Sequence, residues 1–343
     1  MPTGMSLLFV CGSTVCACLV IGVGEGCVVR GLGILLGVAA DGLFGDPEGV
    51  GHPVAVFGRF AGWVERRVYG GSRGRGVVHV VVCVGAAGGL GVVAERVSRR
   101  SSVGRTAVTA LATWAVLGGT SLGREGVFMA RALEGGDLEA ARGRLPHLCG
   151  RDPSGLGEGE LVRATVESVA ENTSDAVVAP LFWGAVAGVP GLLVYRAVNT
   201  LDAMVGHRSE RYEHFGWAAA RVDDLANWVP ARVTAGLACL LAPVVGGSPP
   251  EALAVWIRDG HRHPSPNAGR CEAAFAGGLG VRLGGRNEYG GRVEYRPELG
   301  DGGRPEVSDI RRAVRLARVV GVAAGVLAVG VSWGLRGRPT VRR

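Results

Sequence analysis

Long apolar runs alternate with polar segments along most of this chain. Runs of about 18 residues or more can form helices that cross a bilayer, whereas shorter runs fit buried helices equally well. The six clearest runs cover residues 7–23, 28–40, 77–94, 106–123, 176–198 and 319–335, and a less uniform seventh covers 229–247. This pattern predicts a mainly α-helical, polytopic integral membrane protein.

Two features of the runs predict departures from simple crossings. The runs on either side of the basic turn 95–105 are expected to form a helical hairpin. The run 176–198 contains Pro180 and Pro190. Because a proline inside a helix removes a hydrogen bond and clashes with the preceding turn, two prolines favour a broken or re-entrant segment.

Four polar regions separate the runs: residues 41–76, 124–175, 199–228 and 248–318. The second should be largely helical, with a break at Gly-Gly just before Asp137, and the last is rich in Gly and Pro. We expect these regions to form helical and Gly/Pro-rich loops on one face of a single membrane-embedded domain.

That domain is predicted to cover residues 31–343, preceded by an extra N-terminal apolar segment, 1–30. A signal peptide is the alternative for this segment. It is disfavoured because no basic residue precedes the run and no small-residue cleavage site follows it.

Composition supports the membrane assignment. Hydrophobic residues make up 48% of the 343 residues, charged residues 20%, and glycine is abundant at 59 residues. Small residues let membrane helices approach closely, although a GC-rich genome would also raise the glycine content. The eight cysteines form no CxxC pair and are interpreted as small apolar residues rather than metal ligands or a disulfide framework.

The net charge of +7 points to anionic partners. Its basic residues are scattered among acids, without a basic helix or an aromatic-studded groove, so nucleic acid is not an expected partner. Anionic lipid headgroups and a phosphorylated ligand explain the charge better.

Acidic residues gather beside the apolar runs. The segment DGLFGDPEGVGHPV sets Asp41, Asp46 and His52 among Gly and Pro residues that fix a tight backbone. Carboxylates on such a loop can hold a hard cation such as Mg²⁺, and Asp46 is the candidate ligand. A capped turn at a helix end is the alternative.

A second acidic group precedes the run 176–198. In VESVAENTSD, Glu167, Glu171 and Asp175 recur every four residues, which places them on one face of a helix, with Asn172 beside them. Three acids on one face repel one another unless a cation lies among them. The alternative is a solvated surface helix.

A third group follows the run, in NTLDAMVGHRSERY and ARVDDLANWVPAR. Carboxylates close to arginines and carboxamides fit a metal–nucleotide site, in which the metal bridges phosphate oxygens and arginines neutralise the remaining charge. Structural ion pairs are the alternative. No P-loop motif is present, so a nucleotide site would be of another type. The residues concerned are Asn199, Asp202, Arg208, Arg221, Asp223, Asp224 and Arg232.

The later segment HRHPSPNAG contributes Asn267 as a polar candidate. Its His261 and His263 lack a third ligand at a familiar spacing, so metal binding there is not favoured.

Several long motifs occur in one order along residues 32–300. They are GDP…HPV, GDLEAAR, GRD (150–152), ESVAEN, APLFW, YRAVNTLDAMVG, FGWAAARVDD, PAR, SPNAG and LGGRNEYGG. In these motifs the chain resembles the adenosylcobinamide-phosphate synthase family of cobalamin biosynthesis, called CobD or CbiB. Residues before about 30 have no counterpart in the family pattern. His207 stands where the pattern has an aromatic residue or lysine.

The resemblance implies an integral membrane enzyme that joins adenosylcobyric acid to aminopropanol or its phosphate through an amide bond, giving adenosylcobinamide or its phosphate. Forming an amide from a carboxylate requires a better leaving group than oxide. Activation by ATP with Mg²⁺ provides one, and the acid and arginine clusters could bind both.

The resemblance assigns no residue roles, so the following assignments rest on residue chemistry. We expect catalytic roles for Glu167, Glu171, Asn172 and Asp202. The metal ligands are expected to be Asp46, Asp175, Asp223 and Asp224. Nucleotide or anion binding is expected from Arg151, Arg196, Asn199, Arg208, Arg221, Arg232 and Asn267.

Two other function classes fit the sequence less well. A transporter should show similar halves, and none are visible. A non-catalytic membrane scaffold of the corrinoid assembly complex would not need acids and arginines gathered beside the apolar runs.

The enzyme is expected in the cell membrane, as a multi-pass protein with its site loops in the cytoplasm, where ATP is available. Expected partners are the corrinoid and amine substrates, the lipid bilayer and other late cobalamin-pathway membrane enzymes. The basic turn 95–105 would then lie outside, against the positive-inside tendency.

Overall fold

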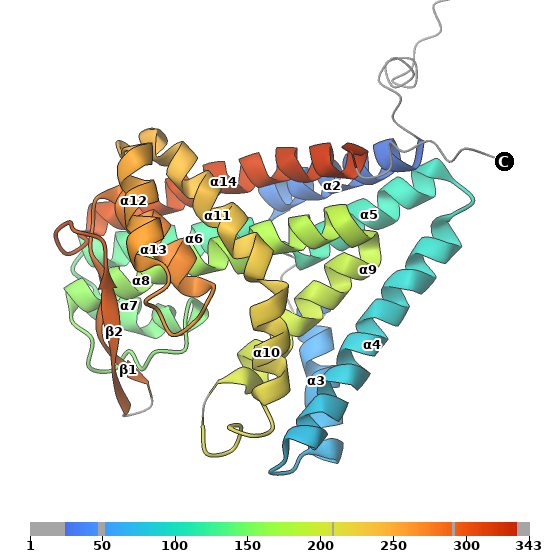
Figure 1. Ribbon diagram of the computed structural model, residues 1–343, viewed down its shortest axis with the longest axis horizontal. Helices are drawn as coiled ribbons and strands as arrows, with labels where there is room; N and C mark the ends of the chain where they lie inside the picture. Colours follow the sequence, from blue (N-terminus) through green and yellow to red (C-terminus); the bar gives the residue numbers. More distant parts are fainter. Residues whose placement is uncertain (1–24, 47–51, 208, 290–291, 335–343) are drawn as a thin grey trace, which may run out of the picture.

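The structure is a computed structural model that describes residues 25–46, 52–207, 209–289 and 292–334. It is mainly helical, as the apolar pattern predicts (Figure 1). Residues 1–24 of the predicted N-terminal segment lie outside the described residues, and residues 25–30 form the first turns of a helix.

The helices form two connected groups. The first comprises α2 (Glu25–Phe44), α3 (Pro53–Val68), α4 (Arg73–Ser98), α5 (Ser102–Val116), α9 (Ala179–Leu201) and α10 (Trp217–Ala226). The second comprises α6 (Gly119–Glu134), α7 (Leu138–Arg144), α8 (Glu158–Thr173), α11 (Trp228–Leu241), α12 (Pro249–Asp259), α13 (Ala268–Leu279), and strands β1 (Leu283–Tyr289) and β2 (Arg292–Leu299). Helix α14 (Val307–Gly334) runs along both groups, and its second half packs on α2 (Figure 1).

Four helical stretches among the described residues are long and apolar enough to cross a membrane. They are Arg73–Ser98, Glu158–Gly206, Trp228–Val245 and Val307–Gly334. Large apolar side chains on α4 and on the second half of α14 are exposed at the protein surface, as expected for helices that contact lipid. The protein is therefore a multi-pass membrane protein.

The basic turn joins α4 to α5, and the two helices form the predicted hairpin. The run 106–123 is not one helix, however. Helix α5 ends at Val116 because Leu117 adopts an extended backbone, and a new helix, α6, begins at Gly119. The apolar run was extended through this break, although the pair Gly118–Gly119, followed by Thr120 and Ser121, is a helix-breaking signal in the sequence.

The chain reverses direction within the apolar run 176–198. Gly188 has φ 68° and ψ −149°, a conformation open essentially to glycine alone, and Pro190 follows two residues later. A Cβ atom on Gly184 would lie 2.8 Å from Leu192 Cδ2, an approach that a continuous helix does not allow between residues eight apart. Helix α9 is thus a helical hairpin, in agreement with the expected re-entrant geometry.

Side chains from two other helices hold the tip of this hairpin. Arg30 of α2 donates to the carbonyl of Ala185 at 3.2 Å, and the Val189 amide donates to Glu95 of α4 at 3.1 Å. At the open end, the Tyr195 hydroxyl lies 3.2 Å from the carbonyl oxygen of Asp175. The reversal therefore places the beginning and the end of the segment close together in space.

The second group carries the main hydrophobic core and a β-hairpin. Helices α8, α13 and α14 bury side chains such as Leu161, Phe275 and Ile310. Strands β1 and β2 pair antiparallel, an element that the sequence analysis did not predict.

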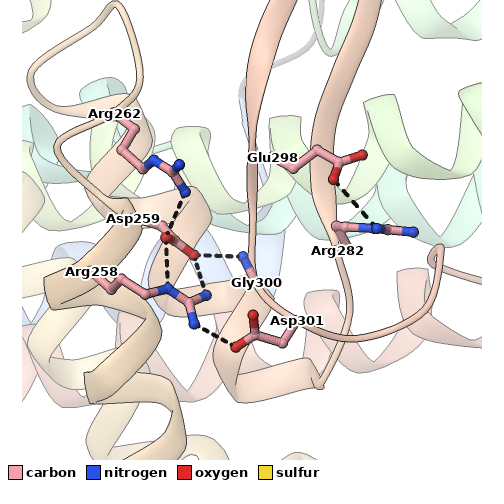
Figure 2. Close-up of polar contacts among 7 residues, drawn as sticks. All are labelled: Arg258, Asp259, Arg262, Arg282, Glu298, Gly300 and Asp301. Atoms are coloured by element: carbon pink, nitrogen blue, oxygen red, sulfur yellow. Dashed lines mark hydrogen bonds and ion pairs between the residues drawn. The ribbon is translucent and has the colours of Figure 1, made fainter.

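An ion-pair cluster fixes the end of β2 to α12 (Figure 2). There Asp259 accepts hydrogen bonds from Arg258, Arg262 and the Gly300 amide. These bonds stabilise Asp259 as an anion, and its pKa is lowered to about 2, mainly by Arg258.

Replacing Gly188 with alanine should destabilise the protein. A side chain at this φ and ψ is strained by about 1–3 kcal/mol, and its Cβ would collide with Glu95 and lie 2.8 Å from Arg30 Nη2. The thermal unfolding midpoint in detergent should fall. The control is Gly85→Ala on exposed α4, where no atom lies within 4 Å of the added Cβ and stability should not fall. Equal midpoints for the two variants would contradict the reversal.

Candidate active site

A cavity of about 200 Å³ lies where the open end of the α9 hairpin meets α8, α10, α11 and α13. Its wall is dominated by polar groups contributed by separate parts of the chain. Five carboxylates line it: Glu171, Asp175, Asp202, Asp223 and Asp224. Asn227, Asn267, Ser174, Ser265 and Cys271 line it as well. The cavity thus combines five of the predicted acids and one predicted carboxamide.

Two π-helical turns present acids at the ends of the hairpin. The turn Ser174–Val178 precedes α9 and carries Asp175, and the turn Asp202–Gly206 follows α9 and begins with Asp202. π-helical turns are rare and occur often at functional sites, because they re-aim side chains within a helix. The Asn199 amide group reaches Asp175 Oδ2 at 3.5 Å, which links the two ends of the hairpin.

A chain of buried hydrogen bonds orients Asp223. The Asn227 Nδ2 group donates to Asp223 Oδ2 at 3.0 Å, and the Tyr195 hydroxyl donates to Asn227 Oδ1 at 2.8 Å. The Trp183 indole donates to the Ala226 carbonyl at 3.0 Å, so the first arm of the hairpin also fixes the end of α10. The second oxygen of Asp223, Oδ1, is buried and has no hydrogen-bond partner among the described residues, so it can accept a bond from a ligand.

The site is strongly acidic for its degree of burial. Burial, and next the nearby Asp202 carboxylate, raise the pKa of Asp223 to about 7. Burial also raises the pKa of Asp224, against the opposing effect of Arg221. Carboxylates crowded in this way keep protons unless a cation compensates their charge.

The oxygen atoms that line the cavity fit a hard cation that is also bound by groups from outside the protein. Carboxylate and carboxamide oxygens are the ligands that Mg²⁺ prefers, and Mg²⁺ is commonly held by one or two carboxylates together with phosphates and water. Among the described residues, no three His, Cys, Asp or Glu side chains already converge as a metal site. The cavity therefore suits a metal–phosphate complex better than a bare ion in a protein cage.

Several of the arginines predicted to bind an anion lie around the cavity. Arg221 pairs with Asp224 at 3.7 Å and is largely exposed. Arg232 donates to Asn267 Oδ1 at 3.3 Å and stacks on the Trp228 ring. Arg196 donates to Asn199 at 3.4 Å, and Arg208 lies outside the described residues.

Glu167 and Arg151 form a buried pair that does not line the cavity. Glu167 also accepts a hydrogen bond from the Gly284 amide at 2.7 Å, so this pair connects α8 to the β-hairpin. Asn172 donates to the carbonyl of Ser168 at 2.8 Å, away from the cavity. The four-residue spacing correctly predicted that Glu167 lies on a helix with Glu171. It could not predict that the β-hairpin covers Glu167.

Asp46 also lies outside the cavity wall. It is close enough to interact electrostatically with His52, Asp41 and Arg196, and its Oδ1 atom is buried without a hydrogen-bond partner. Asp46 and the cavity acid Asp175 both act on Arg196, so this arginine connects the two acidic regions electrostatically.

A polar cluster behind the cavity was not predicted. Glu272 of α13 is 1% exposed, and burial followed by the charges of Glu167 and Glu171 raises its pKa well above the usual range. His263 accepts from Arg296 at 3.0 Å, and burial lowers the pKa of His263 to about 4. A lone acid in the small apolar helix α13 was the available signal for Glu272.

The raised pKa of Asp223 should make the stability of the folded protein depend on pH. Its folded-state pKa of about 7 exceeds the usual value of about 3.9. The folded state therefore binds more protons than the unfolded state between about pH 4 and 7. The contribution of this group is fully present below pH 4 and is lost as pH rises to 7.

Unfolding midpoints in detergent across pH 4–8, without divalent cations, should test this. The wild type should lose stability more steeply than Asp223→Asn between pH 4 and 7. Identical slopes for the two proteins would show that Asp223 titrates normally.

Comparisons with known proteins agree with this architecture. The family model described as CobD/Cbib protein matches residues 34–317. Cobalamin biosynthesis protein CobD of Mycobacterium tuberculosis H37Rv is 57% identical over 300 residues, covering 88% of this chain and 95% of the relative. The CobD protein of Geobacter metallireducens is 46% identical, covering 82% and 91%, and that of Rhodobacter capsulatus is 41% identical, covering 83% and 91%. No solved structure matches the chain. The chain belongs to the CobD/CbiB family of cobalamin biosynthesis proteins.

Proposed function

We propose that this membrane protein is an ATP- and Mg²⁺-dependent amide ligase that joins adenosylcobyric acid to aminopropanol or its phosphate. The carrying observation is the cavity in which Glu171, Asp175, Asp202, Asp223 and Asp224 meet beside arginines and carboxamides. Family membership supports the pathway. The chemistry of the cavity supports the reaction class, because a ligase must bind a metal and polyphosphate together.

The acids divide into two groups by their surroundings. Asp223 and Asp224 are neighbours on α10, and Asp224 pairs with the exposed Arg221. These two acids fit a metal that is also held by phosphate oxygens. Asp175 and Asp202 lie at the two ends of the hairpin. ATP would supply the leaving group that a free carboxylate lacks, while the protein's own groups hold the reacting partners together.

Glu171 is the candidate for proton transfer at the attacking amine. It lies on α8 in the cavity wall, between the acid-rich rim and the buried cluster of Glu167 and Glu272. An ammonium group must lose a proton before its nitrogen can attack, and a positioned carboxylate within hydrogen-bond reach can accept that proton. Asn227 positions Asp223 through its hydrogen bond to Oδ2, and Tyr195 in turn holds Asn227 in place.

Neutral replacements of the cavity acids should slow turnover. We expect Glu171→Gln, Asp202→Asn and Asp224→Asn each to lower kcat/KM at least tenfold, about 1.4 kcal/mol of transition-state stabilisation. The assay combines purified protein in detergent with the corrinoid, aminopropanol phosphate, ATP and Mg²⁺. Glu298→Gln is the matched control, because Glu298 is exposed and pairs with the exposed Arg282 (Figure 2). Unchanged rates in all three variants would make the acids structural.

The same assay separates the proposal from its rivals. A ligase forms product only with ATP present, whereas a scaffold forms none under any condition. Full turnover of the folded protein without ATP would refute the ATP requirement while leaving amide formation standing.

A shared cytoplasmic face is a further expectation. In a background without the native cysteines, Ser154→Cys and Glu213→Cys should resist an impermeant thiol reagent in intact cells, whereas Arg100→Cys in the basic turn should react. All three positions are exposed on the protein. Labelling at only one of positions 154 and 213 would place the two motif-bearing regions on opposite faces and defeat the single-site account.

A further inference from the structure

A second cavity, of about 530 Å³, lies between α2, α6, α8 and α14. Thr173 and Val177 line this cavity, whereas Ser174 and Asp175 line the acidic cavity. The two cavities therefore lie on different sides of the same helical segment, and the second is not part of the site described above.

The wall of the second cavity is mostly apolar. Val38, Leu117, Val314 and Val322 contribute apolar surface from three parts of the chain, and several glycines leave room between the helices. At Gly42 no atom lies within 4 Å of an added Cβ, so the cavity is open on that side. A ligand of this cavity must carry a substantial apolar part.

Two arginines give the cavity a positive rim. Arg124 comes from the first half of α6, and Arg318 is the last charged residue of α14 before the uncharged stretch 319–334. Both side chains are exposed. Within the described parts of the chain, neither guanidinium has a hydrogen bond or a salt bridge, although Arg124 acts electrostatically on Asp41. Arginine pairs are well suited to a phosphate group, whose oxygens accept several N–H bonds at once.

Asp41 provides an independent sign of a ligand. It is 8% exposed and lines the cavity. Its Oδ2 atom accepts from the Thr120 amide at 3.2 Å, and the Thr120 hydroxyl makes its shorter hydrogen bond, 2.7 Å, to the carbonyl oxygen of Asp41. The Oδ1 atom of Asp41 is buried and has no hydrogen-bond partner among the described residues. Because buried polar atoms are nearly always hydrogen-bonded, Oδ1 calls for a donor that the described part of the chain does not supply.

We propose that this cavity binds an anionic glycerophospholipid with a hydroxyl-bearing headgroup, of the phosphatidylglycerol type. Its phosphate would lie between Arg124 and Arg318, a headgroup hydroxyl would donate to Asp41 Oδ1, and an acyl chain would follow the apolar wall.

The surroundings of the cavity suit a lipid rather than a soluble anion. On α14, Val322 is 64% and Val326 is 68% exposed, and on α2, Leu43 is 75% and Phe44 is 69% exposed. These side chains continue the apolar wall onto the protein surface, beside the basic end of the uncharged stretch of α14. Cations at the end of an apolar helix lie at headgroup level in a bilayer.

Thermal unfolding of the purified full-length protein, delipidated in a neutral detergent, tests the proposal. Short-chain dioctanoyl phosphatidylglycerol should raise the midpoint saturably, with an apparent affinity at least tenfold tighter than that of dioctanoyl phosphatidylcholine. The double variant Arg124→Gln/Arg318→Gln should lose this preference. Arg315→Gln is the matched control, because Arg315 is exposed on the same helix but does not line the cavity.

A second variant keeps the test decisive if the double variant does not fold. Gly42→Leu places a side chain into open space in the cavity and should weaken phosphatidylglycerol binding without removing a charge. Equal stabilisation by phosphatidylcholine, or unchanged preference in both variants, would overturn the proposal. Phosphatidylethanolamine matching phosphatidylglycerol would overturn the anionic assignment, and equal stabilisation by inorganic phosphate would indicate a soluble ligand instead. None of these outcomes bears on the ligase assay.

Discussion

The reversal of the chain at Gly188 is the constraint on which the acidic cavity depends. In a continuous helix, Asp175 and Asp202 would be 27 residues and roughly 40 Å apart. The positive φ of Gly188 and the contacts of Arg30 and Glu95 at the tip fold this segment back, so that both acids reach one cavity. This apolar stretch is long enough to cross a membrane, but it folds back on itself, so its two ends lie side by side at the acidic cavity.

Because the chain reverses at Gly188, several carboxylates lie close together in the cavity. Their negative charge favours a cation as the ligand. Five acids from four parts of the chain share a space of about 200 Å³. Burial, followed by the charge of Asp202, raises the pKa of Asp223 to about 7. Carboxylates held in such proximity store repulsion that a divalent cation relieves. The carboxamide of Asn227, supported by Tyr195, prevents Asp223 from turning away from its neighbours. Under the proposed function, a cation that arrives with phosphate ligands would relieve this repulsion.

Sequence patterns predicted the helices and the acids of the cavity, because both can be recognised from residues that are close together in the sequence. The two prolines of the run 176–198 indicated the reversal, and helical spacing indicated Glu171 and Asp175. Proximity to arginines and carboxamides in the sequence indicated Asp202, Asp223 and Asp224. Partners across the fold could not be predicted in the same way. Nothing local to Glu167 shows that Arg151 and the β-hairpin cover it, and nothing in α13 shows that Glu272 lies beside two other acids. The break after Val116 was missed although it has a local signal, the glycine pair at residues 118 and 119, because the apolar run was extended across it.

The position of a bound metal tests the central claim most directly. Anomalous scattering from Mn²⁺ in crystals grown with a non-hydrolysable ATP analogue would locate the metal and the phosphates together. The account predicts metal density within about 2.5 Å of carboxylate oxygens from at least one of Asp202, Asp223 and Asp224, with the triphosphate beside it. Metal and nucleotide bound together at any other place on the protein, or nucleotide bound with no metal in the acidic cavity, would contradict it.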